Sequence, residues 1–151
     1  MPIPINYTTL YETDYLRWLE TTLQKLRAQD YGNVDWQNLI EEIEDLGKSE
    51  RRRLESNLAV ILLHLLKWEF QPEQRKGGWE ASIIEHRQRL NRALKDSPSL
   101  QPYLESIFAE IYVEARKRAR AETGLPLDTF PTHCPYETTE VLDDDFLPGE
   151  K

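Results

Sequence analysis

The sequence lacks the residues needed for an internal disulfide and for a membrane-spanning segment. Its single cysteine, Cys134, rules out a disulfide within the chain and favours a reducing compartment. The longest uninterrupted apolar run, Leu58–Leu63, is far shorter than the roughly 20 residues that span a bilayer. The first residues show no basic stretch followed by an apolar one, so no signal peptide is expected. We therefore expect a cytoplasmic protein that makes no membrane contact.

Motifs of several common enzyme classes are also missing. No glycine-rich phosphate loop and no nucleophile elbow occurs. The neighbours His133 and Cys134 have no second pair at zinc-site spacing. With 27 acidic and 19 basic residues the formal charge is −8, which makes the chain a poor general ligand for a polyanionic nucleic acid.

What the sequence does contain is apolar residues at helical spacing along most of its length, with no stretch that alternates like a strand. The predicted helices cover about Thr9–Ala28, Trp36–Gly47, Glu50–Phe70, Trp79–Lys95 and Pro98–Glu122, with a short one near Thr138–Leu142. Gly47 is expected to stop or kink the second helix, and Ser49 to cap the third. Gly124 is expected to close the fifth.

The third predicted helix contains LAVILLHLLKW, Leu58–Trp68, which is apolar almost all the way round. A helix of this kind belongs at the centre of an array of helices. The tail, residues 124–151, is rich in proline but has enough apolar residues to pack on the helices and be ordered to about Pro148. We therefore predict one all-α domain, residues 1–151: a bundle of about five main helices around a buried third helix, with an ordered C-terminal tail.

Several strings, taken together and in order, resemble one known family: EEIEDLGKSERRRLESNLAVILLHLLKWEFQP, GWEASIIEHR, DSPSLQPYL, EARKRARAETGL, FPTHCPYE and LDDDFLP. The chain resembles the bacterial, mostly cyanobacterial, family called domain of unknown function twenty-nine over nearly its whole length. The resemblance implies an all-α fold and a bacterial cytoplasmic protein. It implies no activity and no site residues, so function has to be argued from the side chains.

An acidic helix face is the first candidate site. Glu41, Glu42 and Asp45 lie within about one turn of each other, and carboxylates at this spacing can bind Mg²⁺ or Mn²⁺. The motif EEIED is similar to part of the pattern in all-α nucleoside triphosphate pyrophosphohydrolases. The alternative is that these side chains form a solvated helix face.

His64 is the second candidate, because it interrupts the apolar helix. With a carboxylate such as Glu50 or Glu42 nearby it would form an acid and base pair or a metal-ligand pair. About 21 Å separate Glu50 from His64 along one helix, so these two cannot hold one ion directly. The alternative is a core histidine that donates one hydrogen bond to a carboxylate or carbonyl of a neighbouring helix.

Arginine and tryptophan side chains near the turn after the third helix form the third candidate. Arg75, Trp79 and Arg87 would suit a small anionic ligand, since arginine offers a planar fork and tryptophan a stacking face. The alternative is that the tryptophans lock the helical hairpin while the arginines pair with glutamates.

Taken together, these features predict a binding or regulatory module whose partner is another protein or a second copy of the chain. The enzyme alternative is a divalent-metal-dependent phosphohydrolase or nuclease that uses Glu41, Glu42 and Asp45, with His64 or Glu50 in support. No cofactor is expected unless Mg²⁺ or Mn²⁺ binds there. Nucleic-acid binding is not expected, although the basic segment that begins at Arg116 keeps it open.

Overall fold

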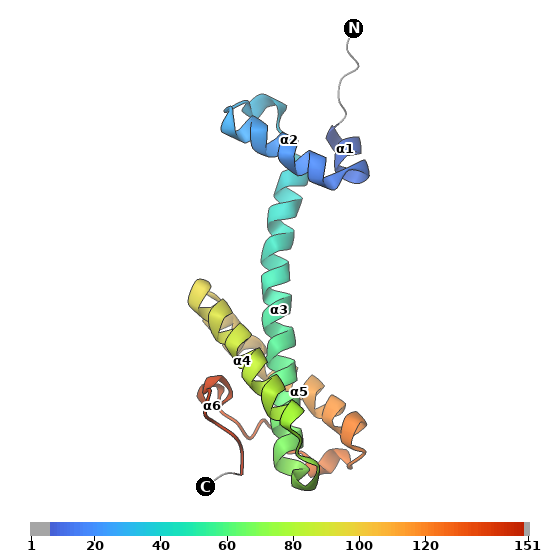
Figure 1. Cartoon of the computed structure of the whole chain (residues 1–151), viewed down its shortest axis with the longest axis vertical. Helices are drawn as coiled ribbons and strands as arrows, with labels where there is room; N and C mark the ends of the chain where they lie inside the picture. Colours follow the sequence, from blue (N-terminus) through green and yellow to red (C-terminus); the bar gives the residue numbers. More distant parts are fainter. Residues whose placement is uncertain (1–6, 150–151) are drawn as a thin grey trace. The chain divides into compact units, whose positions relative to one another are not determined.

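The computed structural model describes residues 7–149, and all regular structure within them is helical (Figure 1). The helices are α1 (Tyr7–Thr13), α2 (Tyr15–Arg27), α3 (Trp36–Phe70), α4 (Gly77–Asp96), α5 (Leu100–Thr123) and α6 (Thr138–Leu142), with short 3₁₀ turns at Tyr31–Asn33, Pro72–Gln74 and Leu127–Thr129. The all-α prediction is confirmed. None of the helices in this part of the chain is long and apolar enough to cross a membrane.

The chain divides into two compact units, with the boundary between Ser49 and Glu50. Unit 1 contains α1, α2 and the first turns of α3. Unit 2 contains the remainder of α3 together with α4, α5, α6 and the tail.

The first predicted helix is in fact two helices. Asp14 separates α1 from α2, and its side chain caps α2 by accepting a hydrogen bond from the backbone N–H of Arg17 at 3.1 Å. A short polar residue that satisfies a free N–H is a favourable helix start, which explains the new start at this point. The prediction of one uninterrupted helix was therefore wrong.

Unit 1 has a small core around one tryptophan. Trp18 on α2 is fully buried, and its indole N–H donates to the Asp35 carboxylate at 3.1 Å. The rings of Tyr11 and Tyr15 pack on it with centroid distances of 4.9 and 6.1 Å. The only other buried hydrophobic side chain among the described residues of this unit is Val34. Unit 1 thus buries few apolar groups.

Helix α3 runs without a break through the position where a stop was predicted. A glycine inside a helix lowers helix stability by about 1 kcal/mol relative to alanine, but it removes no backbone hydrogen bond. The neighbouring helical turns can therefore offset this cost. A side chain at Gly47 would meet no other atom within 4 Å. The predicted second and third helices are therefore one helix.

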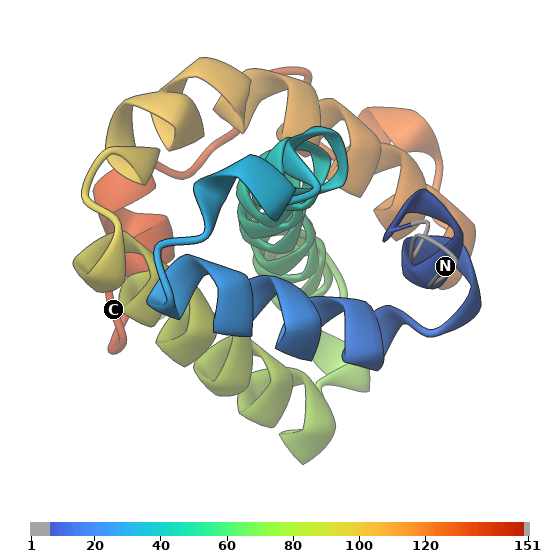
Figure 2. The same cartoon turned by 90° about the horizontal axis from the view of Figure 1, so that it is seen from above.

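The core of unit 2 forms around the later turns of α3. Leu58, Ile61, Leu62, Leu65 and Leu66 are each fully buried, as expected for a helix that is apolar on all sides. Figure 2, a view along this helix, shows α4 and α5 on different sides of it. Side chains of all three helices share one hydrophobic cluster.

The tail completes this core. Phe130, Tyr136 and Val141 are buried in the same cluster, and the ring of Phe130 meets that of Phe70 edge to face at 5.6 Å. The short α6, expected near Thr138–Leu142, has those bounds and lies against α4. Gly124 ends α5 with φ at 73°, the left-handed conformation that was expected of it.

Candidate functional site

Two tyrosines hold one carboxylate of the acidic helix face. The hydroxyl of Tyr15 donates to Oε2 of Glu42 at 2.6 Å, and the hydroxyl of Tyr11 donates to Oε1. These bonds lower the pKa of Glu42, because they stabilise its charged form, and raise the pKa of Tyr11 to about 12. Glu42 therefore ties α1 and α2 to α3 within unit 1.

The other candidate metal ligands do not gather around it. Within residues 7–149, no group of three or more histidine, cysteine, aspartate or glutamate side chains is placed to hold a metal ion. Glu41 and Asp45 are exposed on α3. Glu50 instead pairs with Arg53, one turn away on the same helix, at 3.2 Å.

His64 bonds to its own helix. Its Nδ1 lies 2.8 Å from the carbonyl oxygen of Val60, and since a carbonyl only accepts, Nδ1 carries the hydrogen. The half-buried position lowers the pKa of His64 through desolvation, so the neutral imidazole is favoured. His86 on α4 makes the equivalent contact with Ser82, with Nδ1 2.7 Å from the carbonyl oxygen. Both histidines thus bond to a carbonyl one turn earlier in their own helix.

The candidate anion-binding residues serve separate contacts. Nε of Arg75 donates to the carbonyl of Trp68 at 2.9 Å, and its guanidinium lies 4.7 Å from the centre of that indole ring. Trp79 instead receives the Lys67 ammonium over its ring at 4.6 Å. Each tryptophan therefore lies against a cation, while Arg75 bonds to a backbone carbonyl and not to one of the glutamates considered in the alternative.

Arg87, the third member of that candidate set, is buried and holds the tail. Its guanidinium donates to the carbonyls of Val141 and Phe146 at 2.8 Å each, and to that of Glu140 at 3.3 Å. Burial lowers the pKa of Arg87, while Asp143 and Asp144 act in the opposite direction. All three guanidinium nitrogens are thus used on the backbone.

The basic segment contributes to the same task. Arg116 on α5 donates to the carbonyls of Phe130 at 3.0 Å and Leu127 at 3.2 Å. Its fork therefore faces the tail of its own chain, and not a nucleic-acid backbone.

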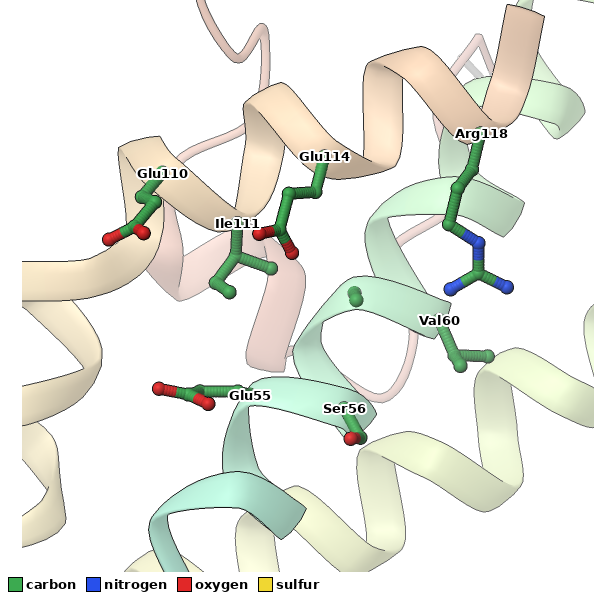
Figure 3. Close-up of a pocket in the computed structure, with 8 residues that line it drawn as sticks. Glu55, Ser56, Val60, Glu110, Ile111, Glu114 and Arg118 are labelled. Atoms are coloured by element: carbon green, nitrogen blue, oxygen red, sulfur yellow. The ribbon is translucent and has the colours of Figure 1, made fainter. Parts of the chain in front are cut away.

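A pocket of about 330 Å³ lies between α3 and α5 in unit 2 (Figure 3). Its lining residues are Glu55, Ser56, Ala59 and Val60 from α3, and Glu110, Ile111, Glu114 and Arg118 from α5. Figure 3 shows Glu110 and Glu114 extending from α5 toward α3, with Arg118 reaching toward Val60. The Glu55 carboxylate already accepts a hydrogen bond from the hydroxyl of Tyr103. The pocket is at the small end of the range for ligand sites and has charges of both signs.

Unit 1 also has a set of exposed apolar side chains. Its members are large apolar side chains that remain exposed at helical spacing: Leu16, Leu19 and Leu23 of α2, and Ile40, Ile43 and Leu46 of α3. We call these six residues the apolar face. Ile43 is 59% exposed and Leu46 67%, which is unusual for residues of this type in such a group. Exposed apolar residues in this number on one small unit are typical of a surface that another molecule covers.

Comparison with known proteins identifies the family. The family model described as domain of unknown function DUF29 matches residues 10–147. The chain belongs to the DUF29 family. This confirms the resemblance predicted from the sequence strings. No curated protein and no solved structure matches the chain.

Two kinds of functional residue in this DUF29 chain escaped prediction. Arg87 was a candidate for an anion site and Arg116 was left open as a nucleic-acid contact, but the acceptors of both are backbone carbonyls of the tail, which no local pattern encodes. The apolar face was hidden in the helix pattern, since Ile40 and Ile43 have the same periodicity as core residues. One sequence feature could have marked this region as different from the rest. The first 49 residues have nine acidic and only four basic side chains.

Proposed function

We propose that the protein is a binding or regulatory module that docks a helix of a protein partner on the apolar face of unit 1. The observation that supports it is the exposure of six large apolar side chains on a unit that buries few. Burial of apolar surface is the main favourable term in protein association. A partner helix with its own apolar stripe would cover such a face by the ordinary packing of helices.

The charges beside the apolar face define the chemistry of the partner. Glu20 lies one turn from Leu16 on α2, and Glu44 lies one turn from Ile40 on α3, with both carboxylates exposed. The first 49 residues have a net charge of −5 from nine acidic and four basic side chains. Because opposite charges at the rim of an interface favour encounter and fix orientation, we expect the partner helix to be basic beside its apolar stripe.

The proposal also covers the cofactor and the compartment. Binding would need no cofactor and would take place in the cytoplasm, the compartment that suits a lone Cys134 thiol. Burial raises the pKa of that thiol to about 11, which makes it unreactive.

Isothermal titration with a synthetic amphipathic helix of leucine and lysine tests the proposal. We expect binding that weakens by about tenfold or more in Ile43→Gln, because central apolar residues dominate such interfaces. The matched control is Ile84→Gln, which removes a similarly exposed isoleucine from α4 and should leave binding unchanged.

Two results would contradict it. Equal binding of a leucine and glutamate peptide would remove the charge argument, and binding that ignores Ile43→Gln would place the site elsewhere. Binding of Mn²⁺ that is lost in Glu41→Gln would instead favour the metal-dependent hydrolase.

A further inference from the structure

Helix α3 itself has the pattern expected of the partner. Ile40, Ile43 and Leu46 form its exposed apolar stripe, and the acidic residues Glu41–Asp45 lie along the same turns. Beyond Gly47 the net charge changes sign: the helix continues with Lys48, Arg51, Arg52 and Arg53, and Glu50 is the one acidic residue among them. The first turns of α3 thus have an apolar stripe with acidic residues beside it. A mainly basic block follows after Gly47.

This order is self-complementary when two copies run antiparallel. In a two-fold pair each residue faces its counterpart about a central point, and contacts occur twice. A two-fold axis at Leu46 lies between the acidic and basic blocks, and it would place Glu44 of each copy beside Lys48 of the other. In this register Leu46 of each copy faces Leu46 of the other, and Gly47 lies next to the axis, where nothing lies within 4 Å of an added Cβ. Small residues of this kind let two helices approach closely.

We propose that the partner of the apolar face is a second copy of this chain, bound through an antiparallel two-fold pairing of α3 near Leu46. This inference depends on the proposed function, since it names the occupant of the same face. A second copy satisfies both requirements set out above. It brings an apolar stripe, and it brings basic residues to the acidic rim.

Sedimentation velocity over a concentration series tests the pairing. We expect a monomer and dimer equilibrium whose dissociation constant rises about tenfold or more in Ile43→Asp, because a charge is placed in the centre of the contact. Ile84→Asp on α4 is the matched control and should leave the dimer unchanged. Circular dichroism checks that each variant remains helical.

A charge exchange tests the register. Glu44→Lys and Lys48→Glu should each weaken the dimer, because each places like charges opposite one another across the two-fold axis. An equimolar mixture of the two variants should form a heterodimer as tight as the unmodified dimer. A charge pair within one helix cannot explain that rescue, since neither chain in the mixture contains the original pair.

The possible failures are distinguishable. A chain that stays monomeric but binds the leucine and lysine peptide through Ile43 overturns the second copy and leaves the proposed function standing. A dimer that is unaffected by Ile43→Asp, or a mixture that does not restore the dimer, overturns the α3 pairing. A chain that neither dimerises nor binds the peptide overturns both.

Discussion

Helix α3 contains two apolar stretches that differ in their surroundings. In the first, Ile40 and Ile43 are each more than half exposed, and in the second, Leu58 and Leu62 are fully buried. The first stretch is apolar along one stripe, whereas the second is apolar on every side. The difference shows that helical periodicity predicts the helix, while only all-round apolarity predicts that the same chain buries it.

The largest expected effect comes from truncating one residue in each stretch. Leu62→Ala should destabilise the protein by about 2–5 kcal/mol, because it leaves a cavity in a filled core. Ile43→Ala should change the free energy of unfolding by no more than about 0.5 kcal/mol, as is usual for an exposed position. Urea unfolding at low protein concentration measures both. A loss at Ile43 as large as that at Leu62 would mean that the first stretch is also part of a core.

A smaller effect is expected from releasing the tail that covers the buried stretch. Arg87→Leu removes the donors to three tail carbonyls and should cost about 2–3 kcal/mol, since buried acceptors are left without partners. Limited proteolysis should then cut the tail earlier than in the unmodified protein. Arg92→Leu, a change on the exposed side of α4, serves as the control. Tail cleavage at an unchanged rate would show that Arg87 does not hold it.

The smallest expected effect is the pH dependence from His64. Burial lowers its pKa in the folded state below the ordinary value of 6.5, so the unfolded chain binds the proton more readily. This contribution to stability is therefore complete above pH 6.5 and declines as the pH falls below it. Urea unfolding of His64→Gln between pH 7.5 and 5 should show a shallower decline than the unmodified protein. An identical decline would assign the pH dependence to other groups.

Much of the fold could be predicted from the sequence, because local patterns of apolar and helix-breaking residues determine most of the helices. The positions of α4, α5 and α6 follow from apolar spacing and from breakers such as Pro98 and Gly124. The continuity of α3 could not be predicted, since the cost of Gly47 is small against the helical turns on both sides of it.

The site was less predictable, for a different reason. Glu42 and His64 were chosen for their chemistry, but their roles depend on partners: two phenols for the first and one backbone carbonyl for the second. Partners of a side chain are set by tertiary packing. The stripe of Ile40 and Ile43 is a different case. Both side chains stay more than half exposed within the described part of unit 1, so no buried packing there could be predicted for them.

The tail also sets an order of assembly. Helices α3, α4 and α5 precede Phe130, Tyr136 and Val141 in the chain, so the core of unit 2 stays uncovered on one side until these three residues dock. The hydroxyl of Tyr136 then donates to the Leu65 carbonyl and the Glu69 carboxylate, at 3.1 and 2.5 Å, on turns already made. Folding intermediates that expose apolar helices in this way are prone to aggregate, and docking of the tail would end that exposure.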